Sequence, residues 1–147
     1  MPAAIAAPTA IYSPALLSLE RVVTDNFALV MEARTGVLAK TAFDVAGVLQ
    51  LHADELADLL NTTTKTLRTY RQARKRLNPT ASEQVLKLLA LARRGEEVFG
   101  DSAAFRRWLS KPAYGLGGQP PLALLQTSGG IDLVAEEVGR IAYGDLA

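Results

Sequence analysis

The sequence predicts an all-α protein in which a helix-turn-helix bundle precedes a smaller helical unit. Apolar residues recur at helical spacing, and no stretch shows the strict alternation that is typical of a strand. Helix start and stop signals divide the pattern, among them Ser13-Pro14, Gly36 and Pro79. The third observation is a local concentration of positive charge from Asn61 to Arg76, in a chain with a formal net charge of only +1.

The N-terminal part is expected to be a tail followed by one helix. Residues 1–12 are rich in alanine and proline without periodicity, and we expect a mobile tail there. Ser13 would cap the helix, with proline at its first position, and Gly36 would lie just past its end. The apolar face of this helix would comprise Leu16, Leu19, Val23, Phe27, Val30 and Met31.

Two shorter helices are expected next. Thr41 can cap the first, and its apolar side would comprise Phe43, Val45, Val48 and Leu49. A linker over residues 50–52 would lead to a helix over Ala53–Leu60. The linker contains His52, the only histidine, for which we favour a surface or packing role over metal binding or catalysis.

The basic segment sorts into two faces when it is placed on a helix. One face would hold Lys65, Arg68, Gln72, Lys75 and Arg76, and the other Leu67, Tyr70, Ala73 and Leu77. Two short amphipathic helices joined by a tight turn, the second of them basic, are typical of a helix-turn-helix. In that motif the second helix enters the major groove of DNA, and its N-terminal residues reach the edges of the bases.

The sequence therefore predicts a DNA-binding face. Its candidate residues are Thr63, Thr64, Lys65, Arg68, Arg71, Lys75 and Arg76. The threonines can equally serve as N-caps of the helix, and the sequence does not separate the two roles. A basic run can also be only a solvated helix face, but the preceding helix and the absence of acidic residues between Asp58 and Glu83 favour DNA. Such binding should weaken steeply with salt, because neutralised phosphates release counterions.

A long helix is expected to link the two halves. Asn78-Pro79 would end the basic helix, and Thr80 to Glu83 reads as a capping box for the next one. That helix would run to Phe99-Gly100, and Gly95 would weaken it. Asp101 or Ser102 would then cap a short helix that ends before Pro112 and has Phe105, Trp108 and Leu109 on one side.

The last part is expected to be a loop and two helices. For the glycine-rich segment 113–121 a flexible turn with positive φ is favoured over a phosphate site, because the lysine and hydroxyl residue of a P-loop are missing. Pro121 would open a short helix, and Thr127 or Ser128 would start the last one, which would end at Gly144.

Composition narrows the classes of function. With one histidine and no cysteine, most catalytic and metal-binding arrangements have no residues to build them, so we expect neither an enzyme nor a metal or cofactor site. The absence of cysteine fits a reducing compartment. No secretory signal or membrane-spanning run is evident, so we expect a cytoplasmic protein that does not bind membranes.

The C-terminal half carries an ordered set of short motifs. They are VFGD at 98–101, Trp108-Leu109, Pro112, LGG at 116–118, PLALL at 121–125 and GRIAYG at 139–144. In order and spacing they resemble the toxin-binding domain of the Xre/MbcA/ParS antitoxins, over roughly 85–144. The helix-turn-helix and the junction at 76–83 are also similar to that family. Two departures are Ser128-Gly129-Gly130, where an acidic cap is more usual, and Gly95 within the linking helix.

The resemblance implies an antitoxin with an Xre-like helix-turn-helix bundle over 13–79 and a small helical toxin-binding domain over 80–147. Its partner would be a RES-type toxin, similar to ADP-ribosyltransferases, that consumes NAD; the antitoxin would bind no NAD itself. The antitoxin would also form a homodimer and repress its own operon by binding operator DNA. The candidate toxin-binding residues are Trp108, Leu116, Leu122, Leu125, Arg140, Ile141, Tyr143 and Gly144.

Several roles remain open at this point. The final helical turn could block the entrance of the toxin's active site, or Ile141 and Tyr143 could pack within the antitoxin. Trp108 could anchor the core or contact a partner. The whole chain could instead be a stand-alone transcriptional regulator whose second half serves dimerisation, or a protein-binding module with a degenerate helix-turn-helix.

Overall fold

The predicted all-α class is confirmed by a computed structural model that describes residues 12–144. The predicted tail lies outside the described residues apart from Tyr12. Within 12–144 the only β pairing is an isolated bridge between Leu38 and Arg76. The elements are α1 (Pro14–Ser18), α2 (Glu20–Val23), α3 (Asn26–Thr35), α4 (Ala39–Leu49), α5 (Ala53–Leu59), α6 (Thr64–Gln72), α7 (Pro79–Phe99), α8 (Ser102–Leu109), η1 (Tyr114–Leu116), η2 (Pro121–Leu124) and α9 (Ser128–Ala142).

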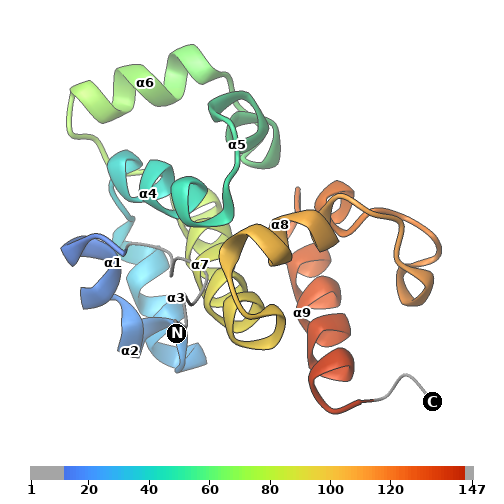
Figure 1. Ribbon diagram of the computed structural model, residues 1–147. Helices are drawn as coiled ribbons and strands as arrows, with labels where there is room; N and C mark the ends of the chain where they lie inside the picture. Colours follow the sequence, from blue (N-terminus) through green and yellow to red (C-terminus); the bar gives the residue numbers. More distant parts are fainter. Residues whose placement is uncertain (1–11, 145–147) are drawn as a thin grey trace, which may run out of the picture.

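Helix α7 is the centre of the molecule. It packs against α3 and α4 on one side and against α8 and α9 on the other (Figure 1). Four of its residues, Val85, Leu86, Leu88 and Leu89, are 0% exposed, so their side chains serve both sides of the helix. One apolar core therefore runs from α3 to α9. The division at residue 79 into two domains stays a prediction, and α7, which begins there, packs against both halves.

The single helix predicted from Ser13 to Gly36 is wrong, because the chain breaks it into α1, α2 and α3. Ser13 caps α1 as predicted and Gly36 ends α3 at φ 94°. In between, the side chain of Thr24 donates to the carbonyl oxygen of Arg21 (3.0 Å), and Asp25 caps a new helix. β-Branched residues and local side-chain hydrogen bonds both disfavour a continuous helix at this point.

The breaks also change which residues of α3 face the core. Leu29 and Ala33 are buried, whereas Phe27 is 74% exposed, Val30 45% and Met31 42%. The predicted apolar face assumed one uninterrupted helical phase from Leu16 onward. Because α3 starts afresh at its own cap, that phase is lost, and three predicted core residues lie on the surface.

Two predicted caps are also wrong, because contacts distant in sequence decide where these helices begin. Helix α4 starts at Ala39, whose N–H donates to the carbonyl oxygen of Lys75 (3.0 Å), and Thr41 lies buried inside it. Helix α7 is capped by Asn78, which accepts from the N–H of Ala81 (2.8 Å), rather than by a box at 80–83. The hydroxyl of Ser82 instead bridges the N–H of Val37 and the carbonyl oxygen of Leu77.

In the C-terminal part the predicted helix caps and turns are confirmed. Asp101 caps α8 and Thr127 caps α9. The segment opened by Pro121 is a short 3-10 helix, and Gly117 and Gly118 have positive φ. None of the helices within 12–144 combines the length and apolar character that crossing a bilayer requires.

The two unexpected glycines have packing reasons. Gly95 does not interrupt α7; a Cβ atom there would clash with the ring of Phe105 on α8. Gly130 lies in the first turn of α9, and a Cβ atom there would clash with the carbonyl oxygen of Leu124. Gly95 therefore allows α8 to pack closely against α7, and Gly130 allows the first turn of α9 to pack closely against the backbone of Leu124.

The start of the described chain is held on α7. Glu20 forms an ion pair with Arg93, and the guanidinium of Arg93 lies 5.2 Å from the ring centroid of Tyr12. Burial raises the pKa of Tyr12 to about 12, and the nearby carboxylate of Glu96 adds to the rise. Tyr12 is thus a neutral packing residue at physiological pH.

Candidate nucleic-acid and partner interfaces

The turn between α5 and α6 is fixed by its own hydrogen bonds. Asn61 adopts a left-handed conformation (φ 56°), and the N–H of Thr62 donates to the carbonyl oxygen of Ala57 (3.0 Å). Thr63 caps α6 by accepting from the N–H of Thr66 (3.1 Å). The hydroxyl of Thr64 donates to the carboxylate of Asp54 (2.6 Å), which ties the start of α6 to α5.

The side chains of Thr63 and Thr64 therefore have structural partners within the protein. The sequence left open whether these threonines cap the helix or contact phosphate, and capping is the role seen for Thr63. Its side chain remains exposed at the N-terminus of α6, where a DNA phosphate could also approach.

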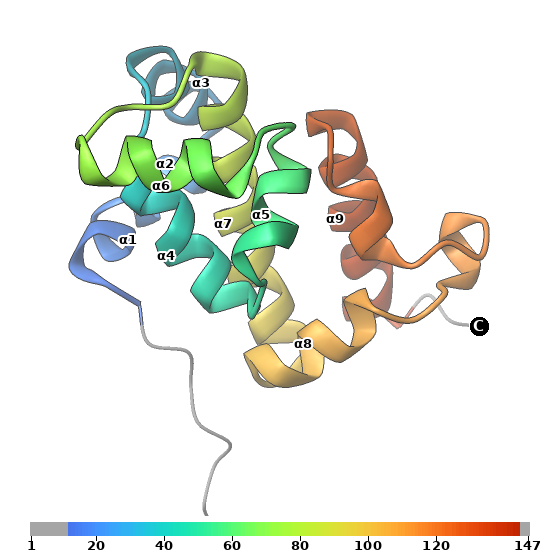
Figure 2. The ribbon, with the colours of Figure 1, turned by 90° about the horizontal axis from the view of Figure 1, so that it is seen from above.

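Helix α6 lies along the upper edge of the molecule in Figure 1 and faces the viewer in Figure 2, which shows the molecule from above. Leu67 is its only buried residue and Tyr70 is half-buried, so the helix is attached by one narrow apolar face. Lys65 and Arg68 are exposed away from Leu67, and Arg71, one turn after Leu67, is exposed at the border of the apolar face. None of the ion pairs within residues 12–144 involves these three cations, so their charge is not neutralised there.

The basic helix ends at Gln72, five residues before Leu77, the last residue that the two-face prediction placed on it. Arg74 turns the chain back with φ 56°. Lys75 and Arg76 therefore lie beyond the helix rather than on its cationic face, and Ala73 is exposed rather than part of its apolar face. Leu77 is buried as expected, although it lies in the segment between α6 and α7 and not on the helix.

Three predicted DNA-binding cations also make contacts inside the protein. The guanidinium of Arg71 lies 4.1 Å from the ring centroid of Phe43, and the ammonium of Lys75 lies 5.2 Å from that of Tyr70. Arg76 donates from Nη1 to the carbonyl oxygen of Gly36 (2.7 Å). All three side chains remain exposed, so these contacts restrict them without removing them from the surface.

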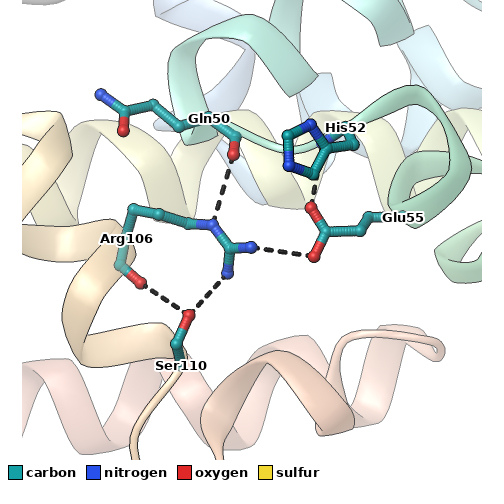
Figure 3. Close-up of polar contacts among 5 residues, drawn as sticks. All are labelled: Gln50, His52, Glu55, Arg106 and Ser110. Carbon is teal, nitrogen blue, oxygen red and sulfur yellow. Dashed lines mark hydrogen bonds and ion pairs between the residues drawn. The ribbon is translucent and has the colours of Figure 1, made fainter.

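A polar cluster joins α8 to the helix-turn-helix (Figure 3). The guanidinium of Arg106 donates to the carboxylate of Glu55 (2.8 Å), to the carbonyl oxygen of Gln50 (3.3 Å) and to the hydroxyl of Ser110 (2.8 Å). The other carboxylate oxygen of Glu55 accepts from the backbone N–H of His52 (2.9 Å). His52 thus begins α5 as an exposed cap residue, in keeping with the predicted surface role.

A second polar contact joins the same two parts through α7. The side chain of Gln84 is buried and donates to the carbonyl oxygens of Leu59 (3.1 Å) and Gln126 (2.7 Å). Between this contact and Arg106 lies a cleft of about 450 Å³, and Leu122 is among its lining residues. Neither contact was predicted, because single polar residues within helices give no sign of their distant partners.

An aromatic cluster supports the C-terminal half. The ring of Trp108 lies 5.2 Å from that of Phe99 and 5.9 Å from that of Phe105 between centroids. Phe105 is 2% exposed, whereas Trp108 keeps part of its surface exposed. Trp108 is therefore a core anchor with one accessible side, and both roles considered for it remain compatible with its position.

The predicted toxin-binding residues differ in how far a partner can reach them. Leu125 is 0% exposed and so belongs to the core beneath the surface. Leu116, Leu122 and Ile141 are half-buried, and Arg140, Tyr143 and Gly144 are exposed. Tyr143 is 81% exposed, so it does not pack within the protein.

Sequence reasoning missed two exposed apolar side chains on this side of the molecule. Leu133 is 52% exposed and precedes Arg140 on α9 by two helical turns. Tyr114 is fully exposed on η1, which packs along α9. Helical spacing from Arg140 could have identified Leu133, whereas nothing in the glycine-rich segment marked Tyr114. We call Tyr114, Leu133, Arg140 and Tyr143 the C-terminal surface.

Comparisons with known proteins match both halves of the chain. Residues 28–90 match the antitoxin Xre-like helix-turn-helix domain, and residues 94–144 match the antitoxin Xre/MbcA/ParS C-terminal toxin-binding domain. Among solved structures, the chain is similar to one from the crystal structure of the M. tuberculosis MbcT-MbcA toxin-antitoxin complex, with a TM-score of 0.59 and 21% identity over 76% of this chain and 98% of that one. That likeness supports the fold. No curated protein matches in sequence.

Proposed function

Since the chain belongs to the Xre/MbcA/ParS-type antitoxins, we propose that it neutralises a co-encoded RES-type toxin that consumes NAD and that it represses its own operon as a homodimer. The two activities use different surfaces. The cationic side of α6 would bind operator DNA, and the C-terminal surface with the end of α9 would bind the toxin. The protein would contribute no catalytic group and would hold no NAD.

The exposure of Tyr143 is the observation that most favours this role for the end of α9. The last buried residue of that helix is Val138, and beyond it Arg140 and Tyr143 extend into solvent. Arginine and tyrosine are among the residues that most often dominate the binding energy of interfaces. An exposed pair of them at a helix end can enter a cleft of a partner, and we propose that it blocks the entrance of the toxin's active site.

The charge of α6 supports the DNA-binding part of the proposal. Lys65, Arg68 and Arg71 are exposed on one helix, on the second helix of the helix-turn-helix. Such helices contact bases in the major groove, and a homodimer places two of them about one turn of DNA apart on a near-palindromic site. Repression would follow if that site overlaps the promoter.

The test of toxin neutralisation is deletion of residues 140–147. The full-length protein and the truncated protein are each co-expressed with the toxin, and NAD consumption and binding to promoter DNA are measured. We expect the truncation to restore NAD loss and to leave DNA binding intact. Unchanged inhibition by the truncated protein would contradict the proposed role of this segment, and failure of the full-length protein to copurify with a toxin would favour a stand-alone regulator.

A further inference from the structure

A buried carboxylate holds Arg140, the one cationic residue of α9. Glu137 is 9% exposed, and its Oε1 atom accepts from both Nε (2.8 Å) and Nη2 (2.6 Å) of Arg140. The side chain of Glu137 is 12% exposed, whereas that of Arg140 is 46% exposed. The carboxylate thus lies inside the protein surface while the guanidinium it binds lies at the boundary with solvent.

Gly115 makes room for this carboxylate. A Cβ atom at position 115 would clash with both carboxylate oxygens of Glu137. The backbone of η1 therefore covers Glu137 closely, which only a glycine permits. Because the loop and the helix confine the carboxylate together, Glu137 has little freedom to follow Arg140 if the guanidinium moves.

The arrangement leaves one side of the guanidinium available. A guanidinium has five N–H donors in a rigid plane. Two of them, on Nε and Nη2, bind Glu137, and within residues 12–144 no hydrogen bond is made by Nη1. A planar group fixed along one edge presents its remaining donors in a set direction, which suits acceptor oxygens of a partner.

We propose that Glu137 is a positioning residue that orients Arg140 toward acceptor oxygens of the toxin. This inference rests on the proposed function, since it assumes that Arg140 contacts the toxin. Glu137 itself does not reach the partner; it acts by holding the guanidinium in its binding orientation before the complex forms. Preorganisation of this kind reduces the loss of side-chain freedom on binding.

A double-mutant cycle on the full-length protein tests the proposal, with dissociation constants for the purified toxin as the readout. Arg140→Ala should weaken toxin binding about tenfold to a hundredfold, and Glu137→Ala about fivefold to tenfold. If Glu137 acts through Arg140, the double variant should bind like Arg140→Ala alone. Effects that multiply would show that Glu137 contributes independently, and they would overturn the proposal.

Two further variants separate positioning from folding. Glu137→Gln keeps the shape and one acceptor oxygen, so it should bind between wild type and Glu137→Ala. Gly115→Ala should weaken binding more in the wild-type background than once Arg140 is alanine, because the part of its effect that passes through Glu137 is then lost and only that on the neighbouring Tyr114 remains. The control is Lys40→Ala, which removes an exposed ion pair with Asp44 on α4, far in sequence from the C-terminal surface, and should leave toxin binding unchanged.

A measurement without toxin distinguishes failure of this inference from failure of the proposed function. In the free protein, the Nε–H resonance of Arg140 should be protected from solvent exchange, and Glu137→Ala should abolish that protection. An unprotected resonance in wild type overturns the positioning role. A protected resonance together with an Arg140→Ala variant that still binds and inhibits the toxin fully would show that the assigned toxin surface is wrong.

Discussion

The side-chain amide of Gln84 lies 2.7 Å from the carbonyl oxygen of Gln126 and 3.1 Å from that of Leu59. One buried residue of α7 therefore ties the end of the first helix of the helix-turn-helix to the segment that precedes α9. The side chain of Asn61, in the turn before α6, also donates to the Gln126 carbonyl (3.4 Å). The helix-turn-helix and the C-terminal part of the chain are thus joined by polar contacts that meet at the carbonyl oxygen of Gln126.

Replacing Gln84 with alanine should lower the free energy of unfolding by about 2–3 kcal/mol. The carbonyl oxygen of Leu59 loses its side-chain donor, that of Gln126 keeps only the longer bond from Asn61, and a small cavity forms. Urea denaturation of the two proteins measures the difference. Gln119→Ala, which changes an exposed glutamine, should remain within about 0.5 kcal/mol of wild type. Equal stabilities for the Gln84 and Gln119 variants would mean that the buried contacts are not important for stability.

The surface position of Phe27 leads to a second prediction about stability. Leu29→Ala should cost about 2–5 kcal/mol, because Leu29 is 6% exposed and packs in the core. Phe27→Ala should cost less than about 1 kcal/mol despite removing the larger side chain, because the ring is 74% exposed. Thermal or urea unfolding of both variants tests the pair, and a large loss for Phe27→Ala would show that its ring is covered in solution.

The elements that local signals define were predictable from the sequence. Ser13, Asp101 and Thr127 cap helices as expected, since a cap depends on residues within one turn. The predictions failed where contacts between residues distant in sequence determine how a helix begins. Ala39 begins α4 because Lys75 lies beside it, and Ser82 bonds to Val37 rather than forming a capping box. Periodicity alone cannot anticipate such pairs.

The candidate sites show the same division. The exposed cations Lys65 and Arg68 follow directly from helical spacing. The turn after Gln72, in contrast, leads Arg76 into a bridge with Leu38, a pairing distant in sequence that helical spacing does not indicate. In the sequence Glu137 is only the second of two adjacent acidic residues. Its burial against Gly115 is a tertiary contact between a loop and a helix, so no local pattern could indicate it.

Two of the glycines inside helices, Gly47 and Gly95, should respond to alanine in opposite directions. Gly47→Ala in α4 should stabilise the protein by about 0.5–1 kcal/mol, because the position is exposed and no atom lies within 4 Å of an added Cβ. Gly95→Ala should destabilise it by about 1–3 kcal/mol, because the methyl group would clash with Phe105 and force α8 away from α7. Urea unfolding provides the comparison. Stabilisation by both variants would mean that α8 is not held closely against α7.

The cationic side of α6 should account for the salt dependence of DNA binding. Lys65→Ala and Arg68→Ala should each weaken operator binding, and each should reduce the slope of log affinity against log salt by about 1, because one fewer counterion is released. Fluorescence anisotropy with promoter DNA at several salt concentrations measures both quantities. Arg107→Ala is the control, since it removes an exposed cation on α8 and should leave the slope unchanged. Toxin binding by the α6 variants should equal that of wild type. Equal loss of DNA and toxin binding would contradict the assignment of the two activities to separate surfaces.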